Sequence, residues 1–279
     1  MRLPKVRGAR QAIVHITLAG AAIVSFFPLF WMLSTSLKTT SGVFASPPVW
    51  WPASPSVSAY VDVATKLNFP LYFRNTLVVS LLSTILSMVF AVLAAYGFSR
   101  FRFRGRSLAL MFIVGTQMFP LILLIIPYFT IMQRLGLVNT DLALVIAYSS
   151  FSLPFCTWVL IGFFNSIPRE LDEAAMVDGC SRLGALFRVV LRTALPGIGA
   201  TSVFAFMNSW NQYLFPLVIT TSWRKYTLPL AIASLMGQTR FEWNDVMAAS
   251  VMAAVPPLLL FLAFQKYFVH GLAAGAVKE

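Results

Sequence analysis

The sequence predicts an all-α integral membrane protein with six transmembrane helices in a single domain, residues 1–279. Hydrophobic residues make up 58% of the chain and charged residues only 11%, whereas soluble domains are about 45–50% apolar and about 25% charged. Six windows without Lys, Arg, Asp or Glu each reach the ~20 residues that a helix needs to cross a bilayer. The predicted spans are 12–33, 76–98, 107–129, 142–164, 196–220 and 246–268.

Two further features separate spans from loops. A seventh charge-free window, 39–61, contains Pro47, Pro48, Pro52 and Pro55. Proline removes a backbone donor and breaks helices, which lipid tolerates poorly, so we expect an extramembrane loop there. The first span is longer than the ~7–15-residue apolar core of a signal peptide and lacks a small-residue cleavage site, so we expect it to remain as an anchor.

The distribution of basic residues predicts the orientation in the membrane. With the N-terminus inside, 14 of the 21 Lys and Arg residues fall on the inner side and seven on the outer side, which is the positive-inside bias. Both termini and segment 165–195 are therefore predicted to be cytoplasmic. The formal charge of +12 reflects this bias and does not indicate nucleic-acid binding. The segment "RFRFRGR" at 100–106 is either a short cytoplasmic loop that fixes two spans or a lipid or partner site.

The chain lacks the residue patterns of an enzyme or of a self-powered transporter. It has no Gly-Lys pair, so the phosphate-binding P-loop is absent. Its two histidines, His15 and His270, lie at opposite ends, which argues against a zinc site, a catalytic triad and a bound cofactor. The six windows carry none of the intramembrane charges that secondary carriers use for ion coupling, and no selectivity-filter sequence is present. A transporter of this composition needs an energy source in another subunit.

One polar segment stands out. "RELDEAAMVDGC" at 169–180 holds four of the nine acidic residues. Pro168 and the acids that follow suit the first turn of a helix, Gly179 suits a left-handed stop, and Ser181 suits the cap of a second helix. That second helix carries an amphipathic stripe from Leu183 to Ala194. The residues alone allow either a docking helix at the membrane edge or a solvated loop with ordinary caps.

The wider segment "EAAMVDGCSRLGALFRVVLRTALPG" resembles the EAA loop of inner-membrane permeases of binding-protein-dependent ABC importers. One departure is that Arg192 stands where the family usually has proline, whereas the later proline is kept as Pro196. In such families the EAA helix docks into a cleft of a cytoplasmic ATPase. The resemblance therefore implies that the ATPase-coupling residues are Glu173, Ala174, Ala175, Asp178 and Gly179.

Other segments extend the resemblance to nearly the whole chain. "FMNSWNQYLFPLVIT" at 206–220 and "FQKYFVHGLAAGAVKE" at 264–279 resemble the MalG-like, sugar-importing branch. This branch implies a type I importer fold, a five-helix core behind an N-terminal helix, in the inner membrane. It also implies a second permease, a solute-binding protein outside the membrane, and an ATPase dimer that binds ATP and Mg. Two alternatives remain: a polyol or glycerol-phosphate-type solute, or an ATPase-independent channel or carrier.

Two groups of residues are candidates for further contacts. Asn208, Asn211 and Gln212 have helical i, i+3, i+4 spacing, so they should share a face that avoids lipid. They either line a solute path, together with Trp210 and with Gln117 of the third span, or hydrogen-bond another helix. By resemblance, the C-terminal tail reaches into the ATPase dimer through Gly271, Leu272, Gly275, Val277 and Lys278; the alternative is a short frayed end.

Overall fold

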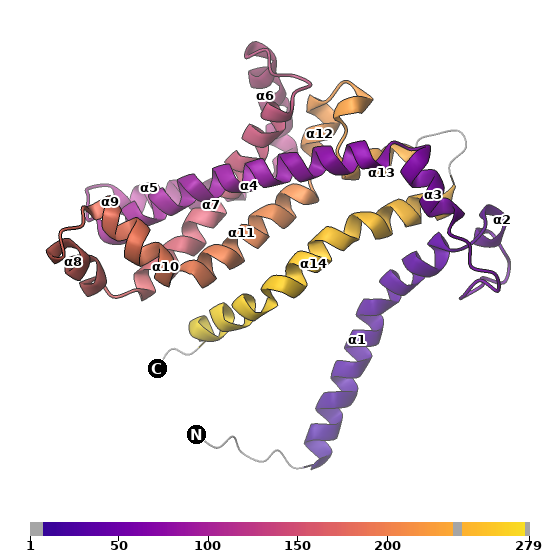
Figure 1. Ribbon diagram of the computed structural model, residues 1–279, viewed down its shortest axis with the longest axis horizontal. Coiled ribbons are helices and arrows are strands. Elements are labelled where there is room, and N and C mark those ends of the chain that lie inside the picture. Colours follow the sequence, from indigo (N-terminus) through magenta and orange to yellow (C-terminus); the bar gives the residue numbers. More distant parts are fainter. Residues whose placement is uncertain (1–7, 237–241, 277–279) are drawn as a thin grey trace. The chain divides into compact units, whose positions relative to one another are not determined.

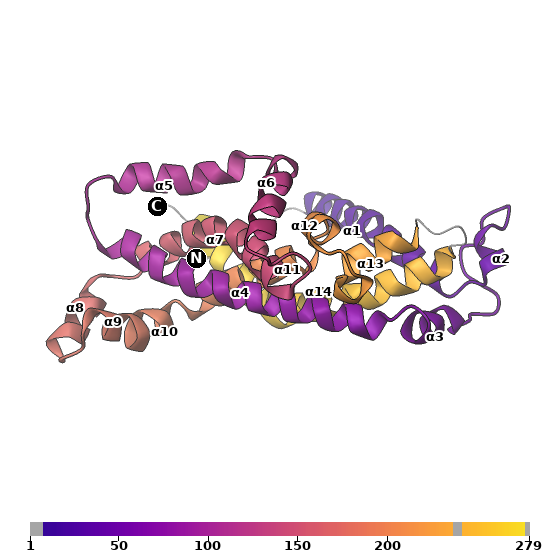
Figure 2. The ribbon, with the colours of Figure 1, turned by 90° about the horizontal axis from the view of Figure 1, so that it is seen from above.

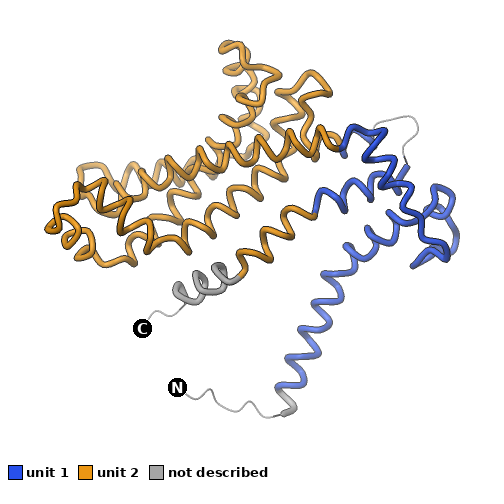
Figure 3. Tube along the Cα trace, in the orientation of Figure 1, with its two compact units in different colours: residues 1–69, 232–254 blue, residues 70–231, 255–279 orange. Residues whose placement is uncertain are grey.

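The structure, a computed structural model, describes residues 8–236 and 242–276, with side chains for 11–236 and 242–265. The described residues form helices and connecting loops without a strand. Two compact units divide the chain (Figure 3): Met1–Phe69 with Ile232–Ala254, and Pro70–Ala231 with Val255–Glu279. The longest helix, Trp243–Ala276, runs from the first unit into the second, and the single domain stays a prediction.

Figures 1 and 2 show the helices in two views. In chain order they are α1 (Gly8–Ser36), α2 (Thr40–Val43), α3 (Ser58–Thr65), α4 (Phe69–Arg100), α5 (Arg106–Gly115), the 3-10 helix η1 (Thr116–Met118), α6 (Leu121–Arg134), α7 (Asp141–Ser166), α8 (Glu170–Val177), α9 (Arg182–Ala185), the π-helix η2 (Leu186–Val190), α10 (Leu191–Thr193), α11 (Leu195–Trp210), α12 (Leu214–Ile219), the 3-10 helix η3 (Trp223–Lys225), α13 (Leu228–Leu235) and α14 (Trp243–Ala276).

Four helices are long and apolar enough to cross a membrane alone: 11–36 of α1, α4, α7 and 243–265 of α14. Two further apolar segments are helix pairs, bent by 100° between η1 and α6 and by 81° between α10 and α11. The number of spans reaches the predicted six if each bent pair is one span. The described part of the chain is therefore all-α with four to six candidate spans. The 100° bend falls inside the predicted span 107–129, whereas the 81° bend falls just before the predicted span 196–220.

The predicted span 107–129 is not one helix. The chain bends after Met118, where Phe119 is extended (φ −77°, ψ 125°) and Pro120 precedes α6. Proline disfavours helical geometry in the residue before it and supplies no amide donor, which explains the break. The predicted span 196–220 is also interrupted, because α11 ends at Trp210 and α12 starts at Leu214.

The first unit anchors the end of α1. The Trp31 and Trp50 rings meet edge to face, and Ser36 Oγ lies 2.7 Å from the Tyr60 hydroxyl. Residues 11–30 of α1 are exposed throughout, as expected of a helix that faces lipid or another subunit. Segment 39–61, the predicted loop, contains only the short α2 and the start of α3.

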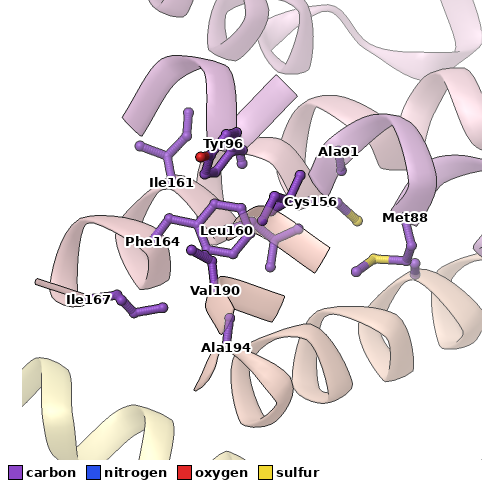
Figure 4. Close-up of a cluster of buried hydrophobic side chains, with 13 residues drawn as sticks. Met88, Ala91, Tyr96, Cys156, Leu160, Ile161, Phe164, Ile167, Val190 and Ala194 are labelled. Carbon is purple, nitrogen blue, oxygen red and sulfur yellow. The ribbon is translucent and has the colours of Figure 1, made fainter. Parts of the chain in front are cut away.

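The second unit has its main core where α4, α7, η2 and α11 meet (Figure 4). A Cβ added at Gly197 would collide with the Phe163 ring, so α11 approaches α7 through a position that only glycine fits. The buried members are Met88, Ala91, Ala95, Tyr96, Cys156, Leu160, Ile161, Phe164, Ile167, Leu186, Val190, Ala194 and Ala205.

The N-terminal part of α4 and the start of α7 hold the loop after α12. Asn75 donates from Nδ2 to the carbonyls of Arg224 and Tyr226 at 2.8 and 3.0 Å. Lys225 Nζ lies 3.0 Å from the Asp141 carboxylate at the first turn of α7. Because α4 has 32 residues, at 1.5 Å per residue it is long enough to join two ends of a membrane-crossing bundle.

Candidate coupling site and polar cavity

The acidic segment forms a short helix with a defined stop. Helix α8 carries Glu170, Asp172 and Glu173 in its first turn, where the helix dipole favours negative charge. At its end, Cys180 N donates to Ala175 O at 2.9 Å and Gly179 N to Met176 O at 3.1 Å. These two bonds form a Schellman motif, which requires a left-handed residue, and Gly179 has φ +84°.

One face of α8 is fixed to the bundle by a buried carboxylate. The Asp172 side chain is 9% exposed, and its Oδ2 forms an ion pair with Arg100 Nε of α4 at 2.9 Å. Its Oδ1 accepts a hydrogen bond from the Tyr96 hydroxyl at 3.0 Å. Ala175, one turn later, is also buried. Of the predicted coupling residues, Ala175 therefore lies on the anchored side.

The opposite face of α8 is open. Glu173 and Ala174 are exposed, and Val177 is 88% exposed. The Glu173 carboxylate makes no hydrogen bond or ion pair with any described residue. Asp178 and Gly179 are also exposed, at the end of the helix. Four of the five predicted coupling residues thus remain accessible on a helix that is held from behind.

The connection from α8 to α11 is helical but irregular. Ser181 Oγ accepts from Gly184 N at 3.1 Å and caps α9, as predicted. The π-turn over Leu186–Val190 then shifts the register of the predicted stripe. Leu186, Val190 and Ala194 are buried, whereas Leu183 and Phe187 are 59% and 58% exposed.

Arg192, the departure from the family pattern, is exposed in α10. The helix continues through it to Thr193, and the 81° bend follows before Pro196. Pro196, the proline that the family pattern retains, lies in the first turn of α11, directly after the bend.

A separate polar cavity lies at the break between η1 and α6. It has a volume of about 360 Å³, within the roughly 300–1,000 Å³ of small-molecule sites. Gln117 Nε2 donates to Phe151 O of α7 at 3.1 Å, and Tyr128 packs against Phe151 and Phe215. The lining residues are Thr116, Gln117, Phe119, Leu124, Tyr128, Ser150, Phe151 and Pro154.

The other solute-path candidates lie elsewhere. Asn208 donates to Ser152 Oγ of α7 at 3.3 Å, and Asn211 donates to Met207 O of its own helix at 2.8 Å. Gln212 is partly buried. Trp210 is 2% exposed and packs against Phe206 and Phe73. The expected shared helical face is interrupted because α11 ends before Asn211.

The predicted tail contact lies largely beyond the described side chains. The helical backbone of α14 continues through Gly271, Leu272 and Gly275 to Ala276. Val277 and Lys278 lie outside the described residues. Contact of this tail with an ATPase stays a prediction.

Comparison with known proteins places these features in a family. Residues 87–273 match the model of the binding-protein-dependent transport system inner membrane component. The chain belongs to this family. The match begins in α4 and ends in α14, so it includes α8 and the polar cavity.

Relatives are similar over most of the chain. A sulfoquinovosyl glycerol transport system permease protein, SmoH of Agrobacterium fabrum, is 40% identical, with 90% of this chain and 88% of that protein covered. The trehalose/maltose transport system permease protein MalG of Thermococcus litoralis is 38% identical, with 92% and 93% covered. A crystal structure of a bacterial ABC transporter involved in alginate import has a TM-score of 0.79 at 25% identity, with 96% of this chain and 100% of that chain covered.

Membership in this permease family confirms the predicted inner-membrane location and the MalG-like resemblance. Arg100 and Tyr96, which hold α8, were not among the residues predicted from the sequence. Arg100 was interpreted only as part of the basic loop at 100–106. The sequence did carry one signal that α8 has a second, anchored face. Asp172 directly precedes Glu173, and neighbouring positions of a helix lie on different faces, so the two acids do not face the same partner.

The Schellman stop of this permease predicts a conformational requirement at position 179. Nothing lies within 4 Å of a Cβ added at Gly179, so substitution there acts through the backbone alone. Gly179→Val should strain the left-handed residue by about 1–3 kcal/mol and reorient the end of α8. Asn tolerates this conformation, so Gly179→Asn is the matched control. We expect Gly179→Val to lower transport at least several-fold more than Gly179→Asn, at equal membrane abundance. Equal transport by both variants would contradict a role for the stop.

Proposed function

We propose that this chain is a transmembrane permease subunit of an ABC importer for a saccharide. It forms half of the translocation path together with a second permease, and it couples to a cytoplasmic ATPase dimer through α8. The observation that carries the proposal is the two-sided character of α8. Its Asp172 side is buried and ion-paired, while its Glu173 side is open.

The open side has the chemistry of a protein-docking surface. Outside the predicted spans, Val177, Leu183 and Phe187 are more than half exposed. Exposed large apolar side chains gathered beside polar ones mark interaction sites. Glu173 adds a carboxylate that can form a charge-assisted hydrogen bond with a basic group, and such bonds are about twice as strong as neutral ones. Ala174 leaves room for the partner backbone to approach.

The partners follow from what the chain lacks and from its family. No Gly-Lys pair of a P-loop occurs in the sequence, so ATP and Mg are assigned to the separate ATPase, and the chain itself is not the enzyme. The family description, binding-protein-dependent transport, supports a solute-binding protein on the outer side. By the MalG-like resemblance, the C-terminal tail adds a second contact with the ATPase.

The polar cavity supports a saccharide as solute. Gln117 offers an amide, and Phe151 offers an aromatic face. Ser150 Oγ donates to Ala147 O and also bonds the Tyr128 hydroxyl, so these two hydroxyls offer mainly acceptor lone pairs to a solute. This combination suits a solute with many hydroxyls and an apolar ring face. No charged side chain lines the cavity, so the cavity itself offers no cation to a phosphorylated polyol. The names of the relatives, sulfoquinovosyl glycerol and trehalose/maltose permeases, point to the same solute class.

The break in the span explains why a cavity can exist at this depth. Irregular backbone is tolerated inside a membrane only where it is buried in protein or lines a cavity. The end of η1 and the start of α6 provide such backbone beside Gln117. In transporters, solute sites are typically built at discontinuous helices. An ATPase-independent channel or carrier would also have a path, but it would have no use for the exposed face of α8.

Charge reversal at Glu173 tests the coupling. Glu173→Lys places like charges together at the proposed contact, which costs several kcal/mol. We expect the complex to lose transport and solute-stimulated ATP hydrolysis, measured after reconstitution, while the permease still inserts in the membrane. Glu170→Lys, at an exposed acid of the same turn, is the control and should retain most activity. Wild-type transport by Glu173→Lys would leave the acidic segment as a solvated loop.

Substitution at Gln117 tests the path. Gln117→Leu removes one hydrogen-bonding group from the cavity, and a hydrogen bond contributes about 0.5–1.5 kcal/mol. We expect saccharide transport to fall roughly two- to ten-fold at low solute concentration, with unchanged ATPase assembly. Asn211→Leu is the same kind of change at an exposed carboxamide that bonds its own helix. An equal loss in both variants would extend the path to Asn211, and unchanged transport in Gln117→Leu would exclude this cavity.

A further inference from the structure

We propose that Arg100, Asp172 and Tyr96 are positioning residues that make α8 a rigid extension of α4 and α7. A displacement of α8 by the ATPase would then be transmitted to the bundle at the C-terminal ends of these two helices. Transmission along the chain into α11 would be the lesser route. The proposal rests on the proposed docking of an ATPase on α8 and adds the route by which that movement is delivered.

The first step is the linkage itself. Both oxygens of the Asp172 carboxylate are engaged by α4, one by Arg100 Nε at 2.9 Å and one by the Tyr96 hydroxyl at 3.0 Å. The side chains of the ion pair are 7% and 9% exposed, so water screens their attraction little. The Tyr96 hydroxyl also lies 3.3 Å from Arg182 O at the start of α9. Helix α8 is therefore attached to α4 at two atoms and not only by the chain.

The second step is the bracing of α4 against α7. Arg100 NH1 and NH2 donate to the carbonyls of Phe164 and Ile167 at the end of α7, at 3.0 and 3.2 Å. In return, Arg169 NH2 donates to Ser99 O at the end of α4, at 2.8 Å. Each helix thus has its C-terminal carbonyls bonded by an arginine of the other segment. Two C-terminal dipole ends that meet side by side repel one another, and the two guanidinium groups offset this.

The third step is the weakness of the alternative route. Between α8 and α11 the chain passes the left-handed Gly179, the π-turn at Leu186–Val190 and the 81° bend at Ala194. The left-handed Gly179 and the bend at Ala194 are places where backbone rotation can absorb a displacement, whereas Leu186 and Val190 of the π-turn are buried in the core. Between α7 and α8, only residues 167–169 intervene, and Arg169 among them is bonded to α4. The braced side of α8 is consequently the stiffer connection.

The fourth step concerns why a buried ion pair, and not apolar packing, links α8 to α4. Apolar residues of similar volume pack at least as stably as a buried ion pair, so packing alone does not require Arg100 and Asp172. The ion pair together with the directed hydrogen bond from the Tyr96 hydroxyl to Asp172 Oδ1 fixes the orientation of α8 relative to α4, which apolar contacts do less well. Fixed orientation is what transmission of a movement requires.

The experiment uses the reconstituted complex with spin labels at Leu93→Cys of α4 and Leu171→Cys of α8, both exposed and neither assigned to the docking face, in a cysteine-free background. We expect one narrow distance distribution that is unchanged between nucleotide-free and ATP-trapped states. Asp172→Asn should broaden this distribution and lower solute transported per ATP hydrolysed at least ten-fold, while the ATPase still co-purifies. Glu170→Gln, an exposed acid of the same helix, should change neither quantity.

Two further variants keep the test decisive. Because Asp172→Asn leaves the Arg100 charge buried without its ion-pair partner, the double variant Arg100→Gln with Asp172→Asn removes that unpaired charge and leaves only the loss of the linkage. It should still broaden the distribution and lower transport per ATP, and recovery of both would overturn the inference. If Asp172→Asn does not assemble, Tyr96→Phe takes its place and should broaden the distribution. A narrow distribution with wild-type transport per ATP in the variant that assembles would overturn this inference alone. Failure of the unmutated permease to co-purify with any ATPase would instead overturn the proposed function.

Discussion

The ion pair between Arg100 and Asp172 determines how α8, the one strongly acidic helix among the described residues, is oriented. By engaging one carboxylate of α8 in the bundle, it turns the neighbouring Glu173, Ala174 and Val177 outward. Without that anchor, an eight-residue helix would have little reason to keep one orientation, since isolated helices of this length are unstable in water. The exposed face, the Schellman stop at Gly179 and the bonded helix ends therefore form one arrangement.

The membrane imposes the second constraint. Backbone groups in lipid need internal partners, so a helix can break only where protein or a cavity takes over. The break at Phe119 and Pro120 meets this condition beside Gln117, where a cavity is lined by polar and aromatic side chains. At the break after Trp210, Asn211 Nδ2 donates to Met207 O and so gives a carbonyl at the end of α11 a hydrogen-bond partner. In this permease the interruptions of the spans are thus the places where polar groups gather.

Much of this arrangement follows from sequence. Apolar windows gave the all-α membrane class, and local rules gave the start of α8, the left-handed Gly179 and the Ser181 cap. The role of Arg100 did not follow, because a local pattern does not reveal a partner 72 positions away. The breaks inside two spans were also missed, because proline is tolerated in many membrane helices and hydropathy does not distinguish a kink from a break of 100°. Exposure of Phe187 depended on a π-turn that no local pattern predicts.

The most direct measurement of the central claim is a site-specific crosslink from α8 in intact membranes. A photo-crosslinking residue placed at Val177, on the open face, should capture the nucleotide-binding subunit, identified by mass spectrometry. The same residue at Leu195, which is also exposed but lies at the start of α11, should not. Capture of the ATPase from Val177 alone is the predicted result. Absence of an ATPase adduct from Val177, in membranes that import the solute, would contradict the account.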